Sequence, residues 1–320
     1  MLSQAIHSSD ELIQQAIAIA EAGNCKRVVV AAAQDADVLD AVSQAQEDGF
    51  LSALLVGDEP SIRKLASDHQ INLDHLEIVH KCDTHEAAHY AVSLASDGKA
   101  DAIMKGFLPT SALLKVVLDK KYALRGTNAL SHCAVLDIPG YHKLLNITDG
   151  GMIVKPDHEQ KLQILDNAVL VSHALGLSPV KVALSAATDK LSVHMSHTLS
   201  DIDNIIPEAL RTLKDIFIQG PLSFDAATSQ RAADYQKISG EVAGDADVYL
   251  VDSVEEGNII SKALVQFADA VFAGVIMGAK VPISLVSRTD SVKNKKASLA
   301  LSCLVAHYYS QHTIQSREGA

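Results

Sequence analysis

The stretch "RVVVAAAQDADVLDAVSQAQEDGFLSALLVG", residues 27–57, decides the fold class. Its first part, residues 27–32, is a short apolar run, and residues 52–57 form a second one. Between them, residues 36–49 carry apolar side chains at helical spacing and end at Gly49, a residue typical of the position just past a helix. A strand, a helix and a strand in this order, with both strands apolar on both faces, indicate a parallel sheet covered by helices.

The same alternation continues along the chain. Strands are predicted at residues 76–80, 101–106, 131–138, 180–186, 246–253 and 271–278, and helices from about Pro60, over 84–98, 159–177 and 295–310. We therefore predict an α/β protein of two domains, each with three α/β/α layers and a mainly parallel sheet. The first domain is expected to comprise residues 1–140 and 291–320, and the second residues 141–290.

Composition narrows the possible partners. The 320 residues are 48% hydrophobic and carry a net charge of −12, which argues against a nucleic-acid binder, although a local Arg or Lys cluster can still bind a small anion. No apolar run is long enough to predict a membrane span. The four cysteines form no CxxC pair, so we expect free thiols, a cytoplasmic location and no metal site.

In parallel sheets, functional residues follow the carboxyl ends of strands. This rule selects Gly57, Lys105 with Gly106, and Ser287 with Arg288. Lys105 and Gly106 precede a predicted helix start at Pro109 and Thr110, where free N–H groups attract phosphate. An ordinary strand-to-helix turn would explain this segment equally well.

The stretch "GVIMGAKVPISLVSRTDS", residues 274–291, gives a stronger signal for an anion site. Gly278 is expected to end one strand, and Ser287 and Arg288 the next. Asp290 or Ser291 is well placed to cap the last helix. A cap does not explain Arg288, because a helix N-terminus repels a cation unless an anion lies between them.

Four further residues are candidates in their local context: Arg125, His132, Asp149 and Asn258. Each has a structural alternative, namely a surface cation, a structural histidine, a tight turn and a helix cap. The chain has no GxSxG, GxxxxGK[ST] or HExxH motif. The chemistry is therefore expected to depend on positioning and charge rather than on a covalent catalyst.

Together these stretches resemble the phosphate acetyl/butyryltransferase family, and its butyryltransferase branch most. The motifs that carry the resemblance are "LSHCAVLDIPGY" (130–141), "ITDGGM" (147–152), "GPLSFDAA" (220–227), "EEGNIISKAL" (255–264) and "GAKVPISLVSRTDS" (278–291). The resemblance implies a fold similar to the isocitrate and isopropylmalate dehydrogenases, with the active site in the cleft between the domains. It also implies reversible transfer of a short acyl group, butyryl preferred, between CoA and inorganic phosphate, without a metal or a permanently bound cofactor.

The resemblance also suggests roles for single residues. Ser287 and Arg288 match a Ser-Arg pair of the acetyltransferase branch, whose base, an Asp six residues after the Arg, is Asn294 here. Asp290 resembles the butyryltransferase pattern and is the substitute candidate, so the expected catalytic residues are Ser287, Arg288 and Asp290. The acetyltransferases carry an Arg before the strand at 101–106 that this chain lacks. The residues expected to bind phosphate or CoA are Lys105, Gly106, Thr110, Arg125, His132, Asp149, Gly278 and Asn258.

Three alternatives stay open at this point. The first is a phosphate acetyltransferase, and the second is a metal- and NAD-dependent decarboxylating dehydrogenase, although we find neither its clustered Asp ligands nor its Arg set. The third is a CoA-binding protein without activity, which only Asn294 favours. The expected partners are small-molecule substrates, with no nucleic acid and no membrane, in a homodimer or a larger assembly.

Overall fold

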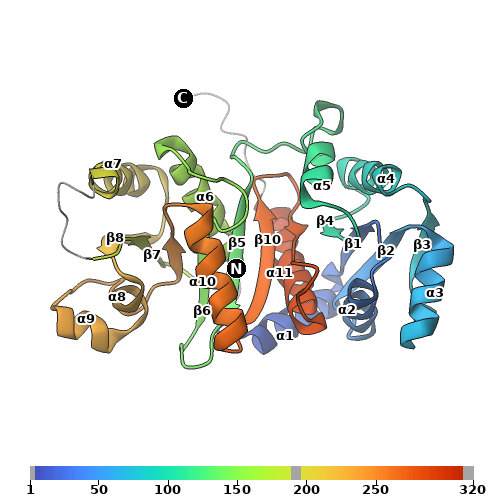
Figure 1. The fold of residues 1–320 in the computed structure, drawn as a ribbon, viewed down its shortest axis with the longest axis horizontal. Helices are drawn as coiled ribbons and strands as arrows, with labels where there is room; N and C mark the ends of the chain where they lie inside the picture. The colour runs from blue at the N-terminus through green and yellow to red at the C-terminus, as the bar shows by residue number, and fades with distance from the viewer. Residues whose placement is uncertain (1–3, 189–195, 313–320) are drawn as a thin grey trace. The chain divides into compact units, whose positions relative to one another are not determined.

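The computed structural model describes residues 4–188 and 196–312, and these form two compact units (Figure 1). We name the units by their place along the chain. The outer unit comprises Ser9–Thr127 and the described residues from Phe272 onward, and the middle unit comprises Asn128–Val271 with the described residues up to Ser8. The domain boundaries predicted from the sequence lie near residues 140 and 290. The ends of the expected first domain, residues 1–3 and 313–320, lie outside the described residues.

The outer unit contains a mainly parallel sheet. Its strands, in spatial order, are β3 (Glu77–His80), β2 (Leu51–Gly57), β1 (Lys26–Ala31), β4 (Ala102–Lys105), β11 (Ile283–Ser284) and β10 (Val271–Met277). All neighbours in this order pair in parallel except β11 and β10. Its helices are α1 (Ser9–Ile19), the π-helical η1 (Ala20–Asn24), α2 (Ala36–Glu47), α3 (Glu59–His69), α4 (Thr84–Ser96), α5 (Thr110–Val117), the short η2 (Lys120–Tyr122) and α11 (Val292–Gln311).

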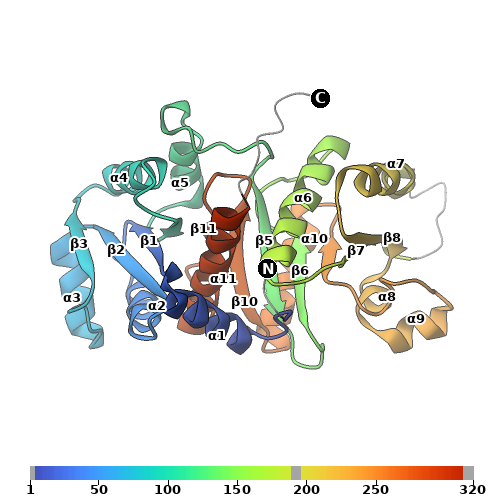
Figure 2. The ribbon, with the colours of Figure 1, turned by 180° about the vertical axis from the view of Figure 1, so that it is seen from behind.

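Helices cover the outer unit's sheet in two layers. α11 packs against α2 and α1, and α4 packs against α5 and over β1 and β2 (Figures 1 and 2). Val28, Val29 and Val30 in β1 are fully buried, as the run of apolar residues predicts for a strand covered on both faces. The predicted α/β class is therefore confirmed for this unit.

The middle unit is also built on mainly parallel strands. Its strands, in spatial order, are β5 (Ser131–Asp137), β6 (Leu144–Thr148), β9 (Val248–Leu250), β7 (Val180–Ser185) and β8 (Ile216–Leu222), all parallel neighbours except β5 and β6. Its helices are α6 (His158–Ala174), α7 (Ser196–Thr212), α8 (Phe224–Thr228), α9 (Gln230–Gln236) and α10 (Val254–Phe267). α6 packs against α7, and α8 against α9 (Figure 1). No helix of the described chain is long and apolar enough to cross a membrane.

Two local predictions were wrong. The strand expected to end at Ser287 and Arg288 stops at Ser284, because β4, its parallel neighbour, ends at Lys105, one residue past the partner of Ser284. Asn258 does not cap a helix, since α10 already begins at Val254 with Ser253 as its cap. The cap of α11 is Ser291, whose hydroxyl accepts the Asn294 N–H, and not Asp290.

Candidate active site

Lys105 lies at the carboxyl end of β4, in the outer unit, and is almost fully buried. Its Nζ donates to the backbone carbonyls of Gly106 at 3.1 Å and Leu108 at 3.4 Å. Burial lowers the pKa of Lys105, and the nearby positive charge of Arg288 lowers it further. Lys105 and Arg288, two of the predicted binding residues, therefore belong to one electrostatic site.

Arg288 is held on an aromatic ring. Its guanidinium carbon lies 5.1 Å from the centroid of the Phe107 ring, a cation–π contact that orients the guanidinium plane. Arg288 and Phe107 are both exposed. Among residues 4–188 and 196–312, no hydrogen bond or ion pair to the Arg288 guanidinium is found, so its N–H donors are available to an anion.

Asp290 fixes the turn that carries Arg288. One carboxylate oxygen of Asp290 accepts the Ser287 N–H at 2.6 Å, and the Asp290 N–H donates to the Ser287 carbonyl at 3.2 Å. The Ser287 and Thr289 hydroxyl oxygens lie 3.1 Å apart. The turn therefore presents Ser287, Arg288 and Thr289 to solvent from a closed loop.

The buried Lys295 side chain holds this turn by a hydrogen bond to its backbone. Lys295, on the first turn of α11, is only 1% exposed, and its Nζ donates to the Asp290 carbonyl and lies 3.7 Å from a carboxylate oxygen of Asp37. The neighbouring Asn294 is also buried, and its side-chain oxygen accepts the Phe272 N–H at 3.1 Å. Asn294 therefore has a structural bond at the position where the acetyltransferase branch is expected to carry its base.

The backbone segments of Arg125 and Gly278 lie side by side in the outer unit, while Thr110 is only the first residue of a helix. The Gly126 N–H donates to the Gly278 carbonyl at 3.0 Å, and Arg125 pairs with Ala279 in an isolated bridge. Arg125 Nε donates to the Leu118 carbonyl at the end of α5, so one of its donors already has a structural partner. Thr110 is the first residue of α5, as the sequence predicts.

In the middle unit, Asp149 organises a tight loop after β6. One carboxylate oxygen accepts the N–H groups of His132, Gly151 and Met152 at 2.9–3.1 Å, and the other accepts the Ile153 N–H at 2.9 Å. Burial raises the pKa of Asp149, while the N–H donors and His132 act in the opposite direction. Asp149 thus links the start of β5 to the glycine loop.

Asp149→Asn is expected to lower the free energy of unfolding by about 2 kcal/mol, because its NH₂ group would replace an oxygen that accepts the partly buried Ile153 N–H. Urea unfolding measures the change. Asp157→Asn in the same unit is the control, since Asp157 caps α6 and Asn caps helices equally well. Equal stabilities of the two variants would contradict the role given to Asp149.

Two glycines allow the Asp149 loop to touch α10. A Cβ added to Gly150 would lie 2.8 Å from the backbone carbon of Gly257, and one added to Gly257 would lie 2.7 Å from Gly150 Cα. Asn258 Nδ2 donates to the Gly150 carbonyl at 3.3 Å. The predicted residues His132, Asp149 and Asn258 are therefore in one connected group.

Sequence reasoning did not select Phe107, Lys295 or Gly257. Phe107 directly follows Lys105 and Gly106, and an aromatic residue there was the one available signal. Lys295 is a charged residue inside an apolar helix, which could have marked it as buried and paired. Gly257 has no local signal, because only its contact with Gly150 requires a glycine.

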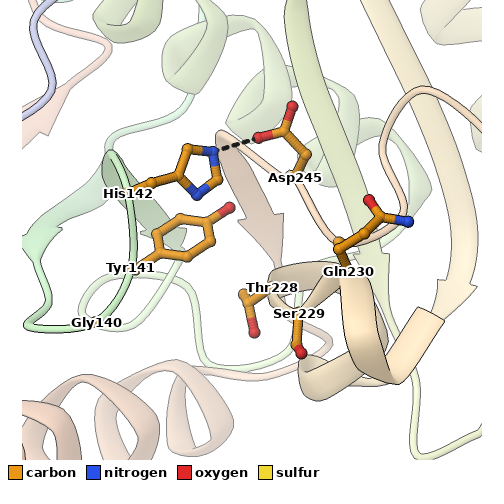
Figure 3. Close-up of a pocket in the computed structure, with 8 residues that line it drawn as sticks. Gly140, Tyr141, His142, Thr228, Ser229, Gln230 and Asp245 are labelled. Atoms are coloured by element: carbon orange, nitrogen blue, oxygen red, sulfur yellow. Dashed lines mark hydrogen bonds and ion pairs between the residues drawn. The ribbon is translucent and has the colours of Figure 1, made fainter. Parts of the chain in front are cut away.

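The middle unit also has a polar pocket of about 500 Å³ that contains none of the predicted residues (Figure 3). His142 and Asp245 line it and lie 2.7 Å apart. Burial opposes ionisation of Asp245, but hydrogen bonds from Lys143 and Lys181 outweigh it and lower the pKa to about 2. The Asp245 carboxylate is thus already paired with His142, Lys143 and Lys181.

Comparison with known proteins supports the sequence prediction. A family model for phosphate acetyl/butaryl transferase matches residues 11–96 and 84–303. A probable phosphate butyryltransferase of Bacillus subtilis (strain 168) is 42% identical over 284 residues, which cover 89% of this chain and 94% of that protein.

Two crystal structures show the same fold. A branched-chain phosphotransacylase from Enterococcus faecalis V583 is 29% identical, with a TM-score of 0.79 over 88% of this chain and 99% of that one. A 4-hydroxythreonine-4-phosphate dehydrogenase from Klebsiella pneumoniae is 11% identical, with a TM-score of 0.54 over 88% of this chain and 99% of that one. The second likeness concerns the fold alone and agrees with the dehydrogenase-like fold expected from the sequence.

The fold and the family match are those of an acyltransferase that works with phosphate. The chain belongs to the phosphate acetyl/butyryltransferase family. The family predicted from the sequence motifs is therefore confirmed.

Proposed function

We propose that the protein transfers a short acyl group, with butyryl preferred, between CoA and inorganic phosphate. A phosphate oxygen attacks the thioester carbonyl carbon, the new C–O bond forms, and the C–S bond breaks to release CoA as a thiolate. The observation that carries this proposal is the exposed guanidinium of Arg288, which is oriented by Phe107 beside the Ser287 hydroxyl and near the buried Lys105 cation.

The proposed role of Arg288 is to hold the phosphate. Its planar fork of donors matches two phosphate oxygens, which positions the nucleophile in line with the thioester. Such positioning can supply roughly 7–11 kcal/mol of barrier reduction at best. The Ser287 hydroxyl is proposed to stabilise the negative charge that develops on the carbonyl oxygen.

The remaining predicted residues stay proposals for phosphate or CoA contact. Lys105 adds positive charge near Arg288, although its Nζ also holds two carbonyls of the following loop. Arg125 retains the guanidinium donors beyond its Nε for a ligand. The others in this proposal are Gly106, Thr110, His132, Asp149, Gly278 and Asn258.

We propose that Asp290 acts by holding the turn rather than as a base. Asp290→Asn is then expected to retain most of the activity, within about threefold, because an amide oxygen still accepts the Ser287 N–H. Asp290→Ala is expected to lower the activity about ten- to a hundredfold. The rate of CoA release measures both. Equal losses in the two variants would instead support a base at this position.

The test of the function is thiol release from acetyl-, propionyl- and butyryl-CoA with and without phosphate. The proposal expects release only with phosphate and the highest kcat/KM for butyryl-CoA. A preference for acetyl-CoA would make the enzyme a phosphate acetyltransferase. Release without phosphate, or none with any of the three, would contradict acyl transfer to phosphate.

We also propose a cytoplasmic homodimer or larger homo-oligomer. The four cysteines are free thiols, which supports a reducing compartment. Light scattering on a sizing column would measure the assembly, and a mass equal to one chain would contradict it.

A further inference from the structure

A cysteine and a histidine lie together at the edge of the outer unit, away from the residues assigned to acyl transfer. His80 is the last residue of β3 and pairs in register with Gly57 at the end of β2. Cys82 follows two residues later, and its Sγ lies 3.0 Å from His80 Nε2. Both side chains are exposed.

The backbone fixes the position of the proton on the imidazole. The Glu59 N–H donates to His80 Nδ1 at 3.1 Å, so Nδ1 must offer its lone pair. In the neutral ring the proton is then on Nε2, and this N–H donates to Cys82 Sγ. The sulfur is the atom that attacks a disulfide, and this N–H is placed to donate to it.

The same geometry disfavours a metal ion. Asp58, His80 and Cys82 each offer a donor atom, and these atoms lie within 4.8 Å of one another. A metal on Nε2 would need the lone pair that its proton occupies, while Nδ1 is held by the Glu59 N–H. Asp58 Oδ1 lies 3.9 Å from Nδ1, and the other carboxylate oxygen accepts the Ser61 hydroxyl.

We propose that Cys82 is a thiol-modification site that reacts with low-molecular-weight disulfides. The thiolate attacks one sulfur of the disulfide, a new S–S bond to Cys82 forms, and the original S–S bond breaks. The departing thiolate takes a proton from water. Cys82 becomes part of a mixed disulfide, while one half of the incoming disulfide leaves as a thiol and the other half stays bonded to the Cys82 sulfur.

The chain supplies its own control. Cys25 is also an exposed free cysteine of the outer unit, but burial and the charge of Asp101 raise the pKa of its thiol. The full chain is treated at pH 7 with iodoacetamide or, separately, with oxidised glutathione, and peptide mass spectrometry follows each cysteine. Cys82 is expected to react about ten times faster than Cys25 with both reagents.

His80→Ala tests the cause of this reactivity. The variant is expected to slow Cys82 about tenfold and to leave Cys25 unchanged, because only Cys82 loses its donor. Equal rates for Cys82 and Cys25 in the unaltered chain would overturn the proposal without any variant. Unchanged reactivity of Cys82 in a folded His80→Ala chain would also overturn it.

A zinc arm separates the metal alternative. The chelator-treated protein is mixed with one equivalent of Zn²⁺ before iodoacetamide, and no protection of Cys82 is expected. If zinc protects Cys82, and if Cys82→Ser abolishes zinc binding in a direct titration, then Asp58, His80 and Cys82 form a metal site and the proposed modification site is wrong.

Discussion

Replacing Arg288 by alanine is expected to lower the phosphate-dependent rate of CoA release by about 10²–10³-fold, the range found when one donor is removed from a charge-stabilising site. The side chain is exposed and contacts the Phe107 ring, so its loss should leave the fold intact. The rate at low and at saturating phosphate measures the effect. A loss that is larger at low phosphate would identify Arg288 as the phosphate-holding group.

Two variants control for charge alone. Arg288→Lys keeps the positive charge but loses the planar fork, and it should recover only part of the activity. Arg125→Ala removes another exposed cation of the same unit, whose Nε already bonds the Leu118 carbonyl, and it should cost less than Arg288→Ala. An Arg288→Ala enzyme with an unchanged rate would remove Arg288 from the site.

The second large effect is expected at Gly106. A Cβ at this position would lie 2.1 Å from the Ala32 carbonyl oxygen and 2.8 Å from that of Ala31. Backbone atoms cannot move away as a flexible side chain can, so Gly106→Ala should cost about 3 kcal/mol of unfolding free energy. Because the Gly106 and Phe107 N–H groups bond the end of β1, the displaced loop should also lower activity.

Gly98→Ala is the matched control for Gly106→Ala. Gly98 has a φ of +69°, and a Cβ there would meet nothing within 4 Å. Only backbone strain is therefore expected, about 1 kcal/mol. Urea unfolding of both variants gives the comparison. A Gly106→Ala chain as stable as the Gly98→Ala chain would show that the loop does not need the close approach.

The regular part of the fold was predictable because its signals are local. The apolar runs at 27–32 and 52–57 became β1 and β2, and the helical spacing between them became α2. Each of these elements is specified by its own periodicity and by its ending residue. The family motifs added the reaction class, which periodicity does not contain.

The errors concern features that depend on distant contacts. Residues 283–287 look like one strand, but the pairing partner β4 ends too early to extend it. Asn258 resembles a helix cap, but Ser253 provides the cap of α10. The preceding Gly257 is required by its contact with Gly150. No sequence window contains both partners of such a contact.

The candidate site was predictable in part for the same reason. The Ser287–Arg288 pair could be selected from its own segment, since a cation near a helix start suggests an anion. The residues that support this pair could not be selected in the same way, because Phe107 lies in the loop after β4 and Lys295 lies on α11. The role of Asp290 likewise became visible only through its bond to the Ser287 N–H.

The central claim is that phosphate attacks the thioester of an acyl-CoA. The most direct test measures CoA thiol and acyl phosphate in the same reaction of butyryl-CoA with inorganic phosphate. The account predicts that both products form at equal rates and that both rates rise with phosphate concentration. Thiol release that is independent of phosphate, or that proceeds without acyl phosphate, would contradict it.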